Sequence, residues 1–350
     1  EPINNYQVRL SWDQAIAKDV VFGGRCVIRH TGKDLANAKF SDSIDLDSSN
    51  GNTTEIVVPA LAGTYTMKFQ DLGRNLSTTE AKVQFTLPET IDELLIDQIR
   101  ENSSFNGLPN PNNTNLSVVS GNLQLANPAT SLTGTYEFEN VFDLGHAYQN
   151  VRLKRVIQSE GFNINNVFDS VTDVDALTSF DGDGSDRLKA KLQVATSAGT
   201  SSFSNFLSLT NGSFVGRSFK FQSTLESVDI NENIKFSILG VDVSLPSRLE
   251  TKRLDENNNV LTSPIQSGTS SSGIDITFAK RFFTGTSAIG GSTTTFLPSI
   301  SIAPEDMPKG AYFVLSSIDG EGFTIIFKDS SDSPINVKFT FQALGYGKGV

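Results

Sequence analysis

Residues 322–342 read GFTIIFKDSSDSPINVKFTFQ, and two alternating runs in this stretch indicate an all-β chain. Apolar residues occupy every second position of the two runs: Phe323, Ile325, Phe327, Val337, Phe339 and Phe341. Thr324, Ile326, Lys338 and Thr340 lie between them. A period of two places one set of side chains in a core and the other in water, which is the pattern of a half-buried strand. The intervening Asp332-Ser333-Pro334 is a turn signal.

Three more short strands precede this hairpin in the sequence. Their apolar runs lie at residues 274–278, 300–302 and 312–315, and turn signals such as Lys309-Gly310 separate them. The five runs predict a β-sandwich over residues 259–350.

The order of the motifs "IDITFAKRFF", "LPSISIAPEDM", "GAYFVLSSIDGEGFTIIF" and "INVKFTFQALGYG" resembles an H-type lectin module. The resemblance implies a small six-stranded antiparallel sandwich of a family that forms trimers and often binds sugars. Its strands carry apolar residues on both faces, whereas the core of a sandwich needs only one apolar face of each sheet. The second apolar face favours a homotrimer, in which another subunit would cover it. We therefore expect a subunit surface around Thr324 and Ile326, with Phe282 and Phe283 nearby.

The composition restricts the partners of the chain. Its 350 residues carry a formal net charge of −11, so nucleic acid and anionic lipid are not expected as partners, whereas neutral glycans and protein receptors remain open. No apolar run approaches the ~20 residues of a membrane span. The single cysteine, Cys26, excludes an intrachain disulfide. The chain starts at Glu1 without a signal peptide, and we expect it to be part of a longer protein.

Residues 1–88 resemble a fibronectin type III module. Trp12 matches the core tryptophan of that family and is expected to be buried, and Tyr65 matches the tyrosine that begins its sixth strand. The string at residues 71–77 matches the turn of the last hairpin. Such modules serve as spacers, and a binding role is the alternative.

Residues 89–134 are expected to form a connector with one short helix and a hairpin. Thr90 is a candidate N-cap, and Ile91, Leu94, Leu95 and Ile99 would lie on one stripe of the helix. This helix would pack on a neighbouring domain or contact another subunit. The hairpin is expected around the turn at residues 120–122.

Residues 135–250 predict a jelly-roll-like sandwich. Its apolar alternation changes phase at Ile238-Leu239-Gly240, which requires a bulge or a bend. The residues expected to point inward are Val151, Leu153, Ile157, Leu188, Ala190, Leu192, Val194, Phe219, Phe221, Ile234, Phe236, Ile238, Val241, Val243 and Leu245.

The motifs "DLGHAYQNVRLKR", "FSNFLSLTNGSFVGRSFKFQSTLES" and "INENIKFSILGVDVSLPSR", followed by the lectin-like module, resemble the C-terminal part of tail tip attachment proteins. These are the J-like host-specificity proteins of long-tailed phages and gene transfer agents. The resemblance implies a trimeric central fibre at the distal end of the tail in the virion, assembled with other tail tip proteins. Its distal modules would contact a host surface glycan or outer-membrane protein. Phe168 and Phe206 stand where family members often have Trp, which argues against a tryptophan sugar platform.

No catalytic residue, cofactor or metal site is predicted. Cys26 and His30 could share one face of a strand as a nucleophile pair, but packing is the favoured explanation. A pair of glycosidase carboxylates stays open, because the sequence does not give their separation. The string around Asp181, Asp183 and Asp186 could wrap calcium or be a solvated turn, and it lacks the glutamate of an EF-hand loop.

Three loops rich in Ser, Thr and Gly are candidates for receptor contact: residues 199–204, 268–273 and 284–295. The sequence identifies no particular ligand-binding residue. It supports a receptor-binding fibre, with a purely structural trimeric segment as the alternative and a polysaccharide hydrolase as the third reading.

Overall fold

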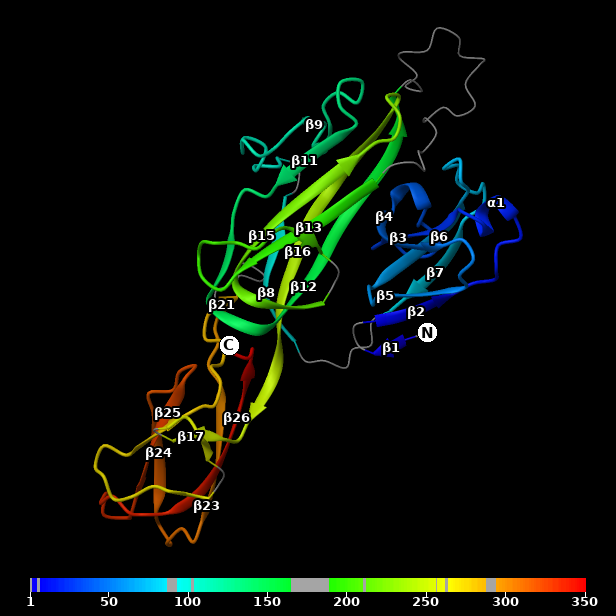
Figure 1. The fold of residues 1–350 in the computed structure, drawn as a ribbon. Coiled ribbons are helices and arrows are strands. Elements are labelled where there is room, and N and C mark those ends of the chain that lie inside the picture. The colour runs from blue at the N-terminus through cyan, green and yellow to red at the C-terminus, as the bar shows by residue number, and fades with distance from the viewer. Residues whose placement is uncertain are drawn as a thin grey trace.

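The computed structural model describes residues 2–4, 7–86, 93–101, 104–164, 189–209, 212–255, 257–261, 264–287 and 294–350. Strands account for nearly all of its regular structure, so the predicted all-β class of antiparallel sandwiches is confirmed. Within the described residues, the helical elements are α1 (Lys18–Val21) and the 3-10 turn η1 (Phe40–Asp42). The N-terminal sandwich lies beside the middle one, and the C-terminal sandwich continues from the end of the middle one (Figure 1).

The N-terminal sandwich packs two sheets over a small apolar core. One sheet has the order β1 (Pro2–Asn4), β2 (Gln7–Ser11) and β5 (Glu55–Pro59). The other has the order β4 (Ile44–Asn50), β3 (Arg25–Thr31), β6 (Gly63–Gln70) and β7 (Ala81–Phe85).

Tyr65 of β6 ties one sheet to the connection that follows β5 of the other sheet. Its buried hydroxyl donates to the carbonyl of Pro59 and accepts from the amide of Leu61, both at 2.6 Å. This is the tyrosine corner found in sandwiches of this type. Trp12 is only half-buried, contrary to expectation, because it lies one residue beyond the end of β2, where its indole donates to the carbonyl of Thr53 at 3.0 Å.

The middle sandwich is built around four long strands. These are β12 (Phe142–Asn163), β13 (Lys189–Ser197), β15 (Gly212–Glu226) and β16 (Glu232–Glu250). β12 pairs with β15 through its first half and with β16 through its second half, so it belongs to both layers. Shorter strands extend the layers: β8 (Glu93–Arg100), β9 (Leu116–Val119), β10 (Asn122–Leu125), β11 (Thr133–Glu137) and β14 (Leu207–Ser208).

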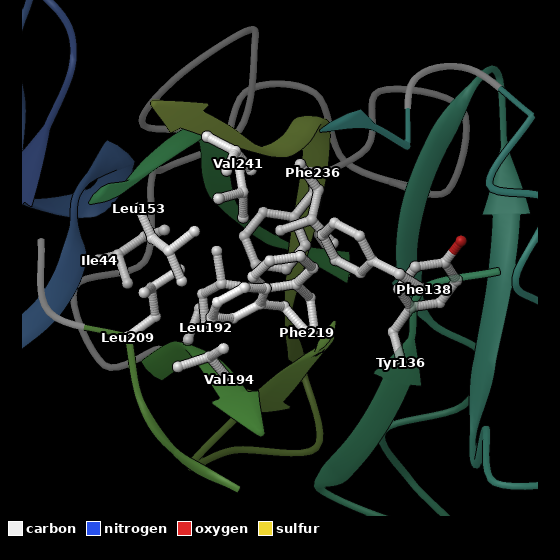
Figure 2. Close-up of a cluster of buried hydrophobic side chains, with 14 of the residues drawn as sticks. Ile44, Tyr136, Phe138, Leu153, Leu192, Val194, Leu209, Phe219, Phe236 and Val241 are labelled. Carbon is white, nitrogen blue, oxygen red and sulfur yellow. The ribbon is translucent and has the colours of Figure 1, made fainter. Parts of the chain in front are cut away.

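Most of the residues predicted to point inward are buried in this core, including Leu192, Val194, Phe219 and Phe236 (Figure 2). Ile157 and Ile238 are half-buried, and Leu188 lies outside the described residues. The predicted phase change is present, but it occurs at Ser237, where the register of β16 with β12 shifts by one residue. As a result Leu239, rather than Ile238, continues the buried face.

The predicted connector helix is wrong. Leu94, Leu95 and Ile99 belong to β8, which pairs antiparallel with Gly240–Pro246 of β16, while Thr90 and Ile91 lie outside the described residues. An isolated helix of this length is marginal, whereas a strand gains a full ladder along the open edge of β16. Ile96 is the extra residue at a register shift and is buried in the core.

The hairpin predicted for the connector is confirmed. Strands β9 and β10 pair directly, and the two residues between them, Ser120 and Gly121, both have positive φ. Two such residues are what a tight hairpin turn of the primed type requires.

All five strands predicted for the C-terminal sandwich are present. One sheet has the order β20 (Ile274–Thr277), β25 (Gly322–Lys328) and β24 (Tyr312–Ser316). The other contains β19 (Ile265–Gln266), β26 (Lys338–Tyr346) and β23 (Ser299–Glu305). Two short hairpins accompany them: β17 (Arg253–Leu254) with β18 (Val260–Leu261), and β21 (Thr286–Ser287) with β22 (Thr294–Thr295).

Two connections couple the middle and C-terminal sandwiches. Strand β16 leaves the middle sandwich and pairs through Ser247–Glu250 with β26. In the other direction, the residues after β26 return to the middle sandwich. The amide of Gln149 donates to the carbonyl of Lys348 at 2.8 Å, and the amide of Gly347 donates to that of Pro246 at 3.0 Å.

A substitution at Gly347 should test this coupling. Gly347 has φ of +73°, and a Cβ there would lie 3.1 Å from the ring of Tyr148 and 3.2 Å from Leu245. Gly310 has φ of +81°, but its nearest contact would be at 3.6 Å. Both substitutions to Ala carry the left-handed penalty of roughly 1–2 kcal/mol. Gly347→Ala should lose about 1–3 kcal/mol more through crowding. Denaturant unfolding followed by circular dichroism measures both, and equal losses would contradict the packing at the junction.

Candidate functional site

The N-terminal sandwich docks on the middle sandwich through Ile44. This residue begins β4, yet it is buried in the core of the middle sandwich, where Figure 2 places it beside Leu153 and Leu209. Strand β3 lies next to β4 and is buried along nearly its whole length. One face of β3 supports its own sandwich through Cys26 and Ile28, and the other face turns towards the middle sandwich.

A cavity of about 510 Å³ lies between the two sandwiches. The N-terminal sandwich contributes β3, β4 and the β6–β7 hairpin, and the middle sandwich contributes β12, β13 and β14. Six basic side chains line the cavity together with three carboxylates. The basic residues are Arg25, Arg29, Arg74, Arg155, Lys189 and Lys191, and the acidic ones are Asp45, Asp47 and Glu226. We call this cavity the inter-sandwich cleft.

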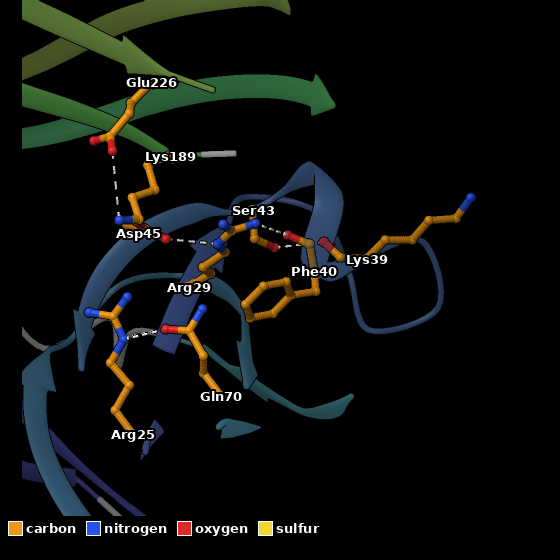
Figure 3. A network of polar contacts seen from close by, with 9 residues as sticks. All are labelled: Arg25, Arg29, Lys39, Phe40, Ser43, Asp45, Gln70, Lys189 and Glu226. Atoms are coloured by element: carbon orange, nitrogen blue, oxygen red, sulfur yellow. Dashed lines mark hydrogen bonds and ion pairs between the residues drawn. The ribbon is translucent and has the colours of Figure 1, made fainter. Parts of the chain in front are cut away.

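Arg29 is held firmly in the wall of the cleft (Figure 3). Its Nε donates to Oδ1 of Asp45 at 2.7 Å, and a terminal nitrogen donates to the carbonyl of Phe40 at 3.1 Å. The guanidinium carbon also lies 4.2 Å from the centre of the Phe40 ring, a cation–π contact. This arginine is therefore a structural part of the wall.

Other cations of the cleft keep their charge uncompensated. Arg25 donates from Nε to the neutral amide oxygen of Gln70 at 2.6 Å (Figure 3). In the described part of the chain, Arg25, Arg74 and Lys191 form no ion pair. Lys189 reaches Glu226 only at 3.9 Å. The cleft therefore presents more positive than negative charge, in a chain whose net charge is −11.

A second cavity of about 500 Å³ lies on the other side of the docking contact. His30, Lys154 and Asp242 are among its lining residues, and Arg155 borders both cavities. Burial lowers the pKa of Arg155 to about 10. This arginine stays charged at neutral pH and contributes to the positive potential between the sandwiches.

Cys26 and His30 do not form a nucleophile pair. They share the inner face of β3 as their spacing predicted, but the rise of a strand separates them by about 13 Å. Burial raises the pKa of the Cys26 thiol to about 12, so the thiolate is scarce at neutral pH. His30 donates from Nε2 to the carbonyl of Ala62 at 3.1 Å, and its ring packs edge-on against Tyr65 at 5.0 Å. The thiol is thus a buried structural group, and the imidazole is held by Ala62 and Tyr65.

The possible calcium string at Asp181, Asp183 and Asp186 lies outside the described residues, as does Phe168. Within the described ranges, no group of three or more His, Cys, Asp or Glu side chains is placed to hold a metal ion. Phe206 is half-buried.

The candidate receptor loops are only partly described. Residues 199–204 and 268–273 are mostly exposed. Residues 288–293 of the third loop lie outside the described residues. Local hydrogen bonds order the second loop, since the hydroxyls of Ser270 and Ser272 lie 2.8 Å apart and Gly268 donates to Oδ1 of Asn336 at 2.8 Å. None of the described loop residues lines the inter-sandwich cleft.

The outer faces of the C-terminal sandwich carry some of the expected residues and others that were not expected. Thr324 and Ile326 are half-buried, and Ile326 is paired with the exposed Val314. Phe282 and Phe283, in contrast, are buried within the chain itself. On the other sheet, Leu249 and Leu344 are 58% and 52% exposed and lie directly opposite each other on β16 and β26. A subunit surface at either face would therefore use these cross-strand pairs.

The sequence did not reveal the inter-sandwich cleft, because its cations come from separate strands and one hairpin. One signal was available. Strand β3 alternates Arg25, Val27 and Arg29 with apolar Cys26 and Ile28. Since arginine is mostly exposed in proteins, only the valine at the centre of this face indicates that it is covered.

Comparisons with known proteins add no family, since no protein-family model matches the chain and no curated protein matches it. Among the described residues, every helix is too short or too polar to cross a lipid bilayer.

The burial of His30 should make stability depend on pH. Desolvation lowers its pKa from 6.5 to about 3, so the unfolded chain binds this proton more readily than the folded one. The stabilisation is complete above about pH 6.5 and is lost as the pH falls towards 3, at about 1.4 kcal/mol per pH unit.

The test compares the unfolding free energy of the wild type and His30→Gln between pH 8 and pH 4. Carboxylate effects common to both proteins cancel in the difference. This difference should stay constant above about pH 7 and shrink below about pH 6.5. A difference that is flat over the whole range would show that His30 titrates normally.

Proposed function

We propose that this chain is the receptor-binding part of a phage tail tip central fibre. In this proposal it sits at the distal end of the tail in the virion, as a homotrimer joined to other tail tip proteins. It binds a glycan or protein of the bacterial surface without covalent chemistry.

The observation that carries the proposal is the coupling of three sandwiches into one body. Strand β16 runs from the middle sandwich into the C-terminal one, and Ile44 anchors the N-terminal one. A fibre tip that docks on a cell needs its modules held in fixed relative positions. The resemblance of the middle and C-terminal motifs to tail tip attachment proteins supports the same function.

The chemistry of the described residues supports binding rather than catalysis. The thiol of Cys26 is buried, and the imidazole of His30 is buried and hydrogen-bonded to the carbonyl of Ala62. The lining of the inter-sandwich cleft contains neither histidine nor cysteine. We propose that recognition involves no bond cleavage and no cofactor.

One observation also favours the structural reading. The exposed pair Leu249 and Leu344 forms an apolar spot on a sheet face, and such spots often mark protein contacts. A segment that only trimerises would need this surface and no receptor site. Adsorption and mass measurements separate the two readings.

The first measurement is competition for the host surface. The purified 350-residue chain should bind host cells and reduce adsorption of the phage that encodes it. Because a trimer binds through several sites, the effect should appear at low protein concentration. A chain that forms trimers but leaves adsorption unchanged would support the structural reading instead.

The second measurement is the mass in solution. Light scattering with size exclusion should give about three times the chain mass of 37.8 kDa, as cyclic symmetry requires. Leu249→Glu with Leu344→Glu should shift the protein towards monomer, because charge is costly in an apolar interface.

Val119→Glu is the matched control, since Val119 is 47% exposed and lies on β9 of the middle sandwich. It should leave the mass unchanged. A wild-type chain that remains monomeric at tens of micromolar would refute the trimer.

A further inference from the structure

We propose that the inter-sandwich cleft binds an anionic saccharide, meaning a sugar that carries a carboxylate or phosphate group. The inference rests on the proposed function, because it names the class of surface glycan that the fibre would recognise.

The distribution of charge is the first argument. The chain carries 39 acidic and 28 basic residues, so most of its surface repels anions. The cleft reverses this ratio, with six basic side chains to three acidic ones. A concave site with low-dielectric walls focuses its local potential, which raises the concentration of ligands of opposite charge.

The second argument is the convergence of available donors. Arg25 comes from β3, Arg74 from the β6–β7 hairpin and Lys191 from β13. In the described structure none of the three is neutralised by a carboxylate. The planar fork of arginine matches both carboxylate and phosphate oxygens in bidentate geometry, and lysine adds a point charge. Three separate segments thus direct cationic donors into one cavity.

The third argument concerns the rest of the ligand. The carboxylate of Asp47 and the hydroxyls of Ser48 and Ser208 line the same cavity. Among the described residues, Asp47 accepts a hydrogen bond only from the neighbouring amide of Ser48, at 2.7 Å. These groups accept and donate hydrogen bonds as sugar hydroxyls require. A carboxylate in the wall also disfavours a densely charged polyanion, so a sugar with one anionic group fits better than nucleic acid.

The fourth argument is shape. Apolar side chains such as Leu76 and Val228 lie between the polar groups, and the C–H face of a sugar ring can pack on them. The volume of about 510 Å³ falls in the range of small-molecule sites. The site lies where Ile44, strand β4 and the η1 turn dock the N-terminal sandwich on β12 and β13 of the middle one.

Titration calorimetry on the full chain tests the proposal with four probes. Galacturonate supplies one carboxylate on a sugar, galactose 6-phosphate supplies a phosphate on a sugar, galactose is the neutral control, and inorganic phosphate tests for a simple ion site. We expect binding of at least one anionic sugar and none of galactose. The affinity should fall as salt is raised, because the attraction is screened.

The variant Arg74→Gln with Lys191→Gln removes two uncompensated cations from exposed positions. It should weaken the binding of the anionic sugar about tenfold or more. Lys309→Gln with Lys338→Gln is the matched control, because it removes the same charge from exposed positions of the C-terminal sandwich. It should leave the affinity unchanged. Circular dichroism of both variants verifies that they fold.

Three results would overturn the proposal: no anionic sugar binds, inorganic phosphate binds as tightly as the sugars, or both double variants weaken binding equally. The adsorption assay distinguishes a failure of this ligand class from a failure of the proposed receptor-binding function. A chain that blocks adsorption but binds no anionic sugar would retain the proposed function and refute this ligand class.

Discussion

The hydrogen bonding of β16 is the constraint on which the rest of the structure depends. This strand pairs with β12 and β10, then with β8, and finally with β26 of the C-terminal sandwich. A strand that left its backbone groups unpaired inside a protein would lose far more free energy than any surface contact returns. The two sandwiches therefore share one ladder, and their relative orientation follows from it.

The placement of the N-terminal sandwich depends on a different interaction. Ile44 of the N-terminal sandwich is buried in the core of the middle one. The polar face of β3 therefore lies opposite the surface of the middle sandwich. The opposing faces carry long arginine and lysine side chains, which do not pack as closely as aliphatic ones. The cavities on both sides of Ile44 are the result. The charge in the inter-sandwich cleft thus arises from the same residues that separate the surfaces.

The alternation of apolar residues predicted where most strands lie, but it did not predict which strands pair with one another. Alternation located the strands around Phe219, Phe323 and Phe339 because each buries one face, which the sequence records directly. It failed at Leu94–Ile99, where the same spacing suits a helix stripe and the deciding factor was an unfilled edge of β16, distant in sequence. The cleft was hidden for the same reason. Its cations become neighbours only after Ile44 has docked, and nothing in the local sequence of Arg74 or Lys191 indicates that contact.

The continuity of β16 has a mechanical consequence. A force that pulls the middle and C-terminal sandwiches apart acts along this strand, parallel to its axis. Its hydrogen bonds with β12 and β8 are then loaded in shear and must yield together, rather than one after another as in peeling. The return of Lys348 to Gln149 adds a second tether across the same junction and resists twisting. The junction is therefore built to transmit tension and torque between the two sandwiches, where an ordinary flexible linker would absorb both.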